Sequence, residues 1–134
     1  MTDAEKQALI GQAIAATQNA YIPYSGYAVG AALRTVAGDV YTGCNIENAS
    51  YPATICAERT ALVKAVSEGA REFDVIVVAT RNGGSPCGIC RQMLFEFAPE
   101  LQVIMVDFDG NIHAQARLND LLLHGFSGSK LDVK

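Results

Sequence analysis

The sequence has few charged residues, and it has no surplus of basic ones. Only 18% of its 134 residues are charged, and 10 Lys and Arg against 14 Asp and Glu leave a formal net charge of −4. DNA or RNA would meet a repulsive field, because the basic residues are also scattered along the chain. We therefore expect no nucleic-acid partner, and a small neutral ligand is the easier one to accommodate.

Long apolar runs are also missing. No uninterrupted apolar stretch is long enough to cross a bilayer, and residues 1–6 have neither the basic start nor the apolar run of a secretory signal. We expect a cytoplasmic protein without a membrane partner. Because that compartment is reducing, the 4 cysteines are better suited to metal binding or burial than to disulfides.

Repeats, low-complexity tracts and linkers are absent too, which predicts a single domain over residues 1–134. Hydrophobic residues make up 50% of the chain, enough for a core. With so few charges, some apolar surface should be covered by other subunits. This composition favours a homo-oligomer.

Hydrophobic periodicity and turn residues predict an α/β fold. Residues 73–79 form a nearly continuous β-branched and apolar run, which is typical of a strand buried on both faces at the centre of a sheet. Further strands are expected at 27–33, 40–46, 102–108 and 112–116, with helices at 3–20, 55–68, 87–98 and 119–123 and a polar tail from 125. This order predicts a three-layer α/β/α sandwich around a mixed five-stranded sheet, whose first two and last two strands form antiparallel pairs.

Three cysteines are candidate metal ligands. Cys87 and Cys90 are three residues apart at the start of one predicted helix, and Cys56 lies at the start of another. Helix N-termini favour the thiolate that binds zinc, and the two helix starts would face the same place if the strands before them are neighbours. Three thiolates leave one coordination position free, and Glu58 in the first helical turn could act on its occupant.

The occupant of that fourth position is open on these residues alone. A water molecule would make an enzyme's site, whereas Cys44 would close a structural four-cysteine site. We favour water, because a free cysteine on a strand commonly packs as a small hydrophobe. Arg59 and Arg91 each follow a ligand cysteine, and we expect both to donate hydrogen bonds to the thiolates and offset their charge.

The pattern Cys56-Ala57-Glu58 followed by Pro86-Cys87-x-x-Cys90 resembles the zinc deaminase signature. The stretches around it extend the resemblance to the small homotetrameric cytidine deaminases over roughly residues 15–126: Pro23-Tyr24-Ser25, Val29 to Ala32, Gly43 to Ala49 and Cys90-Arg91-Gln92. The resemblance implies hydrolytic deamination of cytidine, and of deoxycytidine, to uridine or deoxyuridine and ammonia in pyrimidine salvage. It also implies one zinc ion per subunit, a zinc-activated water, and Glu58 as the proton shuttle.

The same resemblance implies roles in substrate binding. Asn45 and Glu47 match the family's ribose-binding pair, and the backbone N–H of Ala57 would hold the base carbonyl. Tyr27 stands where many members carry a Phe that stacks on the base, so the ring is kept and a hydroxyl is added. Phe126 resembles the aromatic residue that closes a neighbouring subunit's site in the homotetramer.

Two other functions stay open at this point. The first is deamination of a cytosine-containing antibiotic or another amino-heterocycle on the same scaffold, against which the Asn45 and Glu47 pair argues. The second is a non-catalytic domain with a zinc site closed by Cys44.

Overall fold

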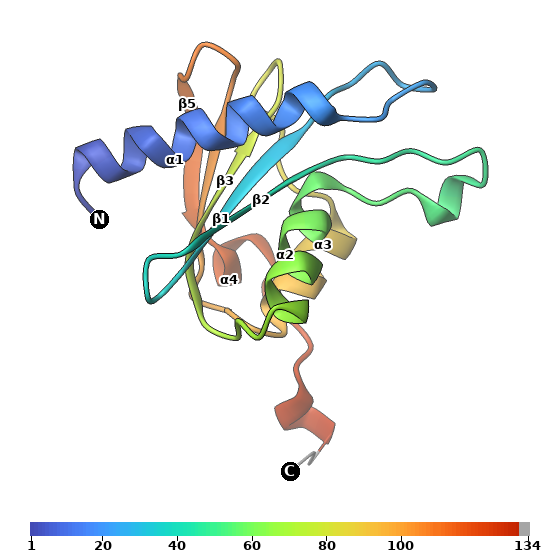
Figure 1. The fold of residues 1–134 in the computed structure, drawn as a ribbon. Coiled ribbons are helices and arrows are strands. Elements are labelled where there is room, and N and C mark those ends of the chain that lie inside the picture. The colour runs from blue at the N-terminus through green and yellow to red at the C-terminus, as the bar shows by residue number, and fades with distance from the viewer. Residues whose placement is uncertain (132–134) are drawn as a thin grey trace.

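A mixed sheet of five strands runs through the computed structural model, which describes residues 1–131 (Figure 1). The strands, β1 (Gly30–Thr35), β2 (Val40–Cys44), β3 (Phe73–Ala79), β4 (Gln102–Val106) and β5 (Ile112–Arg117), are arranged in the order β2-β1-β3-β4-β5. Only β3 and β4 pair in parallel; β1 with β2, β1 with β3 and β4 with β5 pair antiparallel. The predicted mixed sheet and both predicted antiparallel pairs are confirmed.

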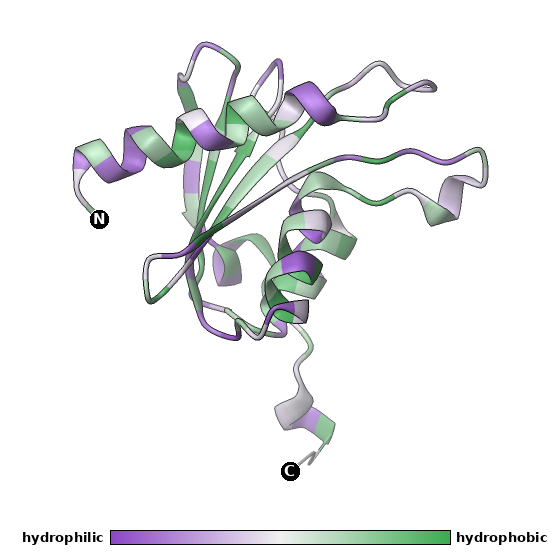
Figure 2. Ribbon diagram, in the orientation of Figure 1, coloured by the Kyte–Doolittle hydropathy of each residue, from purple (hydrophilic) through white to green (hydrophobic). Residues whose placement is uncertain are grey.

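Strand β3 occupies the centre of the sheet because both of its faces are apolar. Ile76 and Val77, which point to opposite faces, are both fully buried. Ile76 belongs to the core cluster on one side of the sheet, and Val77 to the cluster on the other. Figure 2 shows the central strands as mostly hydrophobic, which agrees with the expected position of this segment.

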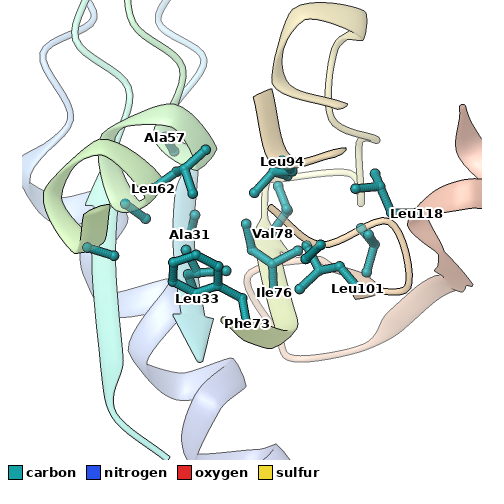
Figure 3. Packing of buried hydrophobic residues seen from close by; sticks show 14 of the residues in the cluster. Ala31, Leu33, Ala57, Leu62, Phe73, Ile76, Val78, Leu94, Leu101 and Leu118 are labelled. Atoms are coloured by element: carbon teal, nitrogen blue, oxygen red, sulfur yellow. The ribbon is translucent and has the colours of Figure 1, made fainter. Parts of the chain in front are cut away.

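Helices cover both faces of the sheet, as expected of an α/β/α sandwich. Helix α1 (Asp3–Ala16) lies alone on one face, where Leu9, Ile10 and Ala13 pack on the strands. Helices α2 (Ala57–Ser67), α3 (Gly88–Phe95) and α4 (Leu118–Leu121) cover the other face. Figure 3 shows the core beneath them, where Leu62, Leu94 and Leu118 come from the helices and Leu33, Ile76 and Val78 from the strands.

Several predicted boundaries were wrong. Helix α3 ends at Phe95 instead of Ala98, β2 at Cys44 instead of Ile46, and β4 at Val106 instead of Phe108. Helix α1 ends at Ala16, and a 3₁₀ turn at Thr17–Asn19 replaces its expected last turn; further 3₁₀ turns lie at Tyr51–Ala53 and Gly128–Leu131. Strand β1 begins at Gly30 rather than Tyr27, because the side chain of Asn45 bonds the Tyr27 carbonyl and the Val29 N–H in place of a neighbouring strand. The predicted tail is described only as far as residue 131. Within these residues, no helix is long and apolar enough to cross a membrane.

The sheet topology brings two helix starts to the same edge. Strands β2 and β3, which precede α2 and α3, are not neighbours, since β1 lies between them. Each of them is antiparallel to β1, so their carboxyl ends nevertheless point the same way. From the end of β2 the chain reaches α2 through the long connection 45–56, whose two ends are joined by the Ile46–Ile55 bridge (Figure 1). From the end of β3 it reaches α3 through residues 80–87.

Helix α2 packs unusually close to the sheet at Gly43 of strand β2. A Cβ at this position would lie 2.6 Å from the carbonyl oxygen of Ala57 and 2.5 Å from the backbone nitrogen of Ala61. Any side chain would push the backbones apart, so only glycine allows this approach. The contact fixes the first turn of α2, which carries Cys56 and Glu58.

Candidate metal centre and active site

Three cysteine sulfur atoms meet where helices α2 and α3 begin. Cys56 is the N-cap residue of α2, Cys87 is the N-cap residue of α3, and Cys90 lies in the first turn of α3. The Cys56 and Cys87 sulfur atoms are 3.8 Å apart, those of Cys87 and Cys90 3.5 Å apart, and all three lie within 4.8 Å of one another.

This spacing fits a zinc ion. Three sulfur atoms at about 2.3 Å from a tetrahedral ion would be separated by about 3.8 Å, close to the observed distances. Cys44 at the end of β2 is not part of the group, so among residues 1–131 the metal-binding cluster has three members. Three ligands leave the fourth position of a tetrahedral site open, as a catalytic zinc site requires.

Neighbouring groups stabilise a thiolate in the cysteine cluster, which favours binding of a cation. The pKa of Cys56 is lowered to about 5, first by a hydrogen bond from the Cys90 thiol and also by Arg59, whose Nη2 donates to the Cys56 sulfur at 3.4 Å. The pKa of Cys90 is raised, because that thiol donates to Cys56 and is buried. Cys56 thus holds a thiolate, the form that binds zinc, and metal binding would displace the proton on Cys90.

Glu58 is buried beside this cluster, in the first turn of α2. Among residues 1–131, Glu58 is the one buried residue with a charged side-chain type, and it is 4% exposed. Burial raises the pKa of Glu58 to about 7, and the negative charge of Cys56 adds to the increase. A carboxyl group with this pKa can accept and return a proton near neutral pH.

A cavity of about 270 Å³ joins these groups. Of the residues predicted to bind substrate or react with it, Tyr27, Asn45, Glu47 and Glu58 line this cavity together with the ligands Cys56 and Cys87. The remaining lining residues were not predicted: Ser25, Val29, Thr54, Val78, Thr80, Gly84 and Ser85. Thr80, Gly84 and Ser85 follow the central strand, and the tendency of ligands to bind beyond strand ends in α/β sheets could have identified them.

Asn45 and Glu47 form hydrogen bonds with residues 24–29 in the wall of the cavity. The Asn45 amide donates to the Tyr27 carbonyl at 2.8 Å and accepts from the Val29 N–H at 3.0 Å. The Glu47 carboxylate accepts from the Tyr24 N–H at 3.0 Å and from both the N–H and the hydroxyl of Ser25. The hydrogen bond from the Ser25 hydroxyl is the main reason that the pKa of Glu47 is lowered.

The two arginines behave differently from one another. Arg59 contacts the Cys56 sulfur as expected, and its Nη2 also donates to the Thr54 carbonyl at 3.3 Å. Arg91 instead donates to the carbonyls of Pro86 and Leu121 and to the Ser85 hydroxyl, at 2.6 to 2.8 Å. Among the hydrogen bonds of residues 1–131, none joins Arg91 to a cysteine sulfur, so that expectation was wrong. Its guanidinium joins the loop before α3 to the end of α4, with one hydrogen bond from each of its three nitrogen atoms.

Ala57 and Phe126 lie outside the lining of the cavity. Ala57 is fully buried at the first position of α2, where a backbone N–H has no partner within the helix. Phe126 is 53% exposed, and its carbonyl accepts from Gln92 Nε2 at 3.0 Å, which holds it beside α3.

Zinc-dependent deaminases pair a three-ligand zinc site with a glutamate that handles protons, and the fold and the cluster with Glu58 place this chain in that class. The family model for the cytidine and deoxycytidylate deaminase zinc-binding region matches residues 3–106, and the chain belongs to this family. It is 44% identical to a cytidine deaminase of Sporosarcina psychrophila over 132 residues, which covers 96% of this chain and 95% of the relative.

A solved structure and a less similar relative agree with this assignment. The crystal structure of a cytidine deaminase from Burkholderia pseudomallei superposes with a TM-score of 0.86 at 45% identity, over 94% of this chain and all of that one. A blasticidin-S deaminase of Bacillus cereus is 33% identical over 94 residues, which covers 63% of this chain and 66% of that protein. These relatives confirm the predicted fold and family, and the zinc-dependent deaminase class of the enzyme.

Proposed function

We propose that this protein catalyses the hydrolytic deamination of cytidine and deoxycytidine to the corresponding uridine nucleosides and ammonia. The observation that carries the proposal is the position of Glu58, buried in the same cavity as the sulfur atoms of Cys56 and Cys87 and with a pKa raised to about 7. The substrate is supported by the relatives named as cytidine deaminases, whose similarity extends over nearly the whole chain.

The reaction needs a nucleophile and a group that moves protons. When zinc is bound by Cys56, Cys87 and Cys90, it supplies the Lewis acidity that makes a water molecule nucleophilic at neutral pH. Glu58 accepts a proton from the attacking water and delivers it to N3 of the pyrimidine. It then moves the second water proton from the oxygen on C4 to the amino group, which leaves as ammonia and leaves the carbonyl of uridine behind.

The proposed ribose site consists of Asn45 and Glu47. Glu47 stays an ionised acceptor, because hydrogen bonds from the Ser25 hydroxyl and from the backbone of residues 24–25 lower its pKa. Asn45 uses one donor and one acceptor within the chain, which leaves a second N–H and a second lone pair for a hydroxyl group. We place the base against the ring of Tyr27, with its carbonyl on the free N–H of Ala57.

The proposal includes a homotetramer in which Phe126 of one subunit completes the site of another. Large apolar side chains are exposed in and after α3, with Ile89 at 62%, Leu123 at 75% and Phe126 at 53% exposure. A mainly apolar groove of about 490 Å³ lies along the same helix. A surface of this kind is typically covered by another subunit. The cytoplasmic location expected from the sequence stays a prediction.

The central test compares Glu58→Gln with the zinc-loaded wild type by following the loss of cytidine absorbance. The variant should lose at least about 100-fold in kcat while keeping its zinc, because only the proton-transfer group changes. Glu68→Gln, an exposed glutamate at the end of the same helix, is the matched control and should keep full activity. Full activity of Glu58→Gln, or an inactive zinc-loaded wild type, would disprove the proposal.

A second candidate substrate class is another amino-heterocycle, which the similarity to a blasticidin-S deaminase favours. The Asn45 and Glu47 side chains in the cavity support a ribose instead. A panel of cytidine, deoxycytidine and blasticidin S decides between them. A kcat/KM for blasticidin S above that for both nucleosides would replace the proposed substrate.

A further inference from the structure

Hydrogen bonds hold both the backbone and the side chain of Tyr27 in place. Its backbone N–H donates to the Ser25 hydroxyl at 3.0 Å, and its carbonyl accepts from the Asn45 amide at 2.8 Å. Its own hydroxyl donates to Oδ1 of Asn82 at 2.5 Å, across 55 residues of sequence. The guanidinium of Arg81 lies 5.2 Å from the ring centre, over the aromatic ring. The backbone is therefore fixed by nearby segments, and the side chain by the loop after β3.

The loop that receives the Tyr27 hydroxyl is itself ordered by Thr80. The buried Thr80 hydroxyl accepts from the Gly84 N–H at 2.6 Å and lies 3.4 Å from Asn82 Oδ1 as a donor. A Cβ at Gly84 would lie 2.9 Å from the Tyr27 hydroxyl, so the loop approaches Tyr27 more closely than a larger residue would allow. The acceptor oxygen thus has a defined position beside the ring.

The outer side of the same loop rests on strand β5. A Cβ at Gly83 would lie 2.2 Å from Cγ of His113, which shows how closely the imidazole packs on the loop backbone. His113 is held in turn by a 2.8 Å contact between its Nε2 and Oδ2 of Asp107. The loop is therefore backed by a fixed side chain and does not depend on Tyr27 alone.

We propose that Asn82 is a positioning residue, which holds the ring of Tyr27 in place for the substrate base through the Tyr27 hydroxyl. Asn82 is not among the residues that line the cavity, whereas Tyr27 is, so Asn82 acts through Tyr27. The inference rests on the proposed function, because that function assigns the ring to the base. A phenylalanine at position 27 would keep the ring and lose the contact that orients it.

The kinetic test uses the zinc-loaded full chain with cytidine. Tyr27→Phe and Asn82→Ala should each raise KM about 3- to 10-fold, as expected for the loss of one hydrogen bond, with kcat changed by less than about twofold. The double variant should resemble the single ones, because all three lack the same contact. Multiplied effects, or an unchanged KM in Asn82→Ala, would overturn the proposal.

Two further variants separate the contact from general damage. Asn82→Asp keeps an acceptor oxygen and should restore most of the wild-type KM. Tyr41→Phe removes a phenolic hydroxyl from β2, outside this cavity, and should leave both constants unchanged. A KM for Asn82→Asp as high as that for Asn82→Ala would contradict the assigned role of the oxygen.

Hydrogen exchange tests the contact without relying on activity. Tyr27→Phe and Asn82→Ala should both speed exchange of the Gly84 N–H about 3- to 10-fold, although neither changes that residue or its partner Thr80. Equal protection in all three proteins would refute the contact even if the wild type proved inactive on cytidine. Faster exchange combined with an unchanged KM would refute the positioning role alone.

Discussion

Replacing Gly43 by alanine tests whether the packing of strand β2 on helix α2 places the catalytic groups. The added methyl carbon would lie 2.5 Å from the backbone nitrogen of Ala61 and 2.6 Å from the carbonyl oxygen of Ala57. Because non-bonded atoms prefer about 3.5 Å or more, the strand and the helix would have to separate by about 1 Å. Backbone atoms cannot rotate aside, so the start of α2 should move with Cys56 and Glu58.

The expected cost follows from this overlap. Forcing an extra methyl group into packed structure costs about 1–3 kcal/mol, which should lower the Tm by roughly 3–12 °C for a chain of this size. A shift of about 1 Å in reacting groups can cost about 100-fold in rate, so kcat/KM for cytidine should fall by up to that factor. Thermal unfolding by circular dichroism and the absorbance assay measure the two effects on zinc-loaded protein.

Gly11 provides the matched control. It lies inside α1, and a Cβ there would meet nothing within 4 Å. Gly11→Ala should raise stability by about 0.5–1 kcal/mol, because alanine favours the helix, and should leave the rate unchanged. If Gly43→Ala matched this control in Tm and in kcat/KM, the close contact at Gly43 would have no part in placing the site.

Two further predictions concern charge. Arg59→Ala removes the hydrogen bond to the Cys56 sulfur and should weaken zinc binding about 10- to 100-fold, measured by competition with a chelator; an unchanged affinity would exclude this role. The pKa of Asp107 is lowered to about 2, mainly by a hydrogen bond from His113. The ionised carboxylate therefore stabilises the fold at any pH above its unfolded pKa of about 3.9, and this stabilisation is lost as the pH falls through about 2. Asp107→Asn should therefore flatten the decline of Tm between about pH 4 and pH 2, and a decline as steep as in the wild type would contradict the linkage.

The parts of the fold that follow from local pattern were predictable. The apolar run 73–79 identified the central strand, because a continuous run of β-branched and apolar residues is typical of a strand buried on both faces. The start of β1 was not predictable in this way, since Tyr27 to Val29 have strand-like residues but pair with the side chain of Asn45. A hydrogen bond from a distant side chain leaves no periodic signal in the segment that receives it.

In the site, too, the features set by local sequence were predictable and those set by distant contacts were not. The metal cluster followed from cysteine spacing and helix starts, and the three sulfur atoms do lie together. Arg91, like Arg59, lies close to a ligand cysteine in sequence, yet its guanidinium donates to the Pro86 and Leu121 carbonyls and to the Ser85 hydroxyl. The bond from Tyr27 to Asn82 joins two segments 55 residues apart, and only the folded chain reveals it. Adjacency in sequence predicts proximity to a site, but not the direction in which a long side chain extends.

The use of Cys56 and Cys87 as N-cap residues has a consequence for the metal-free protein. An ion bound to both would fasten the beginnings of two helices that lie 31 residues apart in sequence. Zinc then acts as a folding ligand, and each tenfold rise in free zinc above its Kd should add about 1.4 kcal/mol to the free energy of unfolding. Chelation should therefore lower the stability of the protein as well as its activity. The melting temperature of this protein should vary with the free zinc concentration around it.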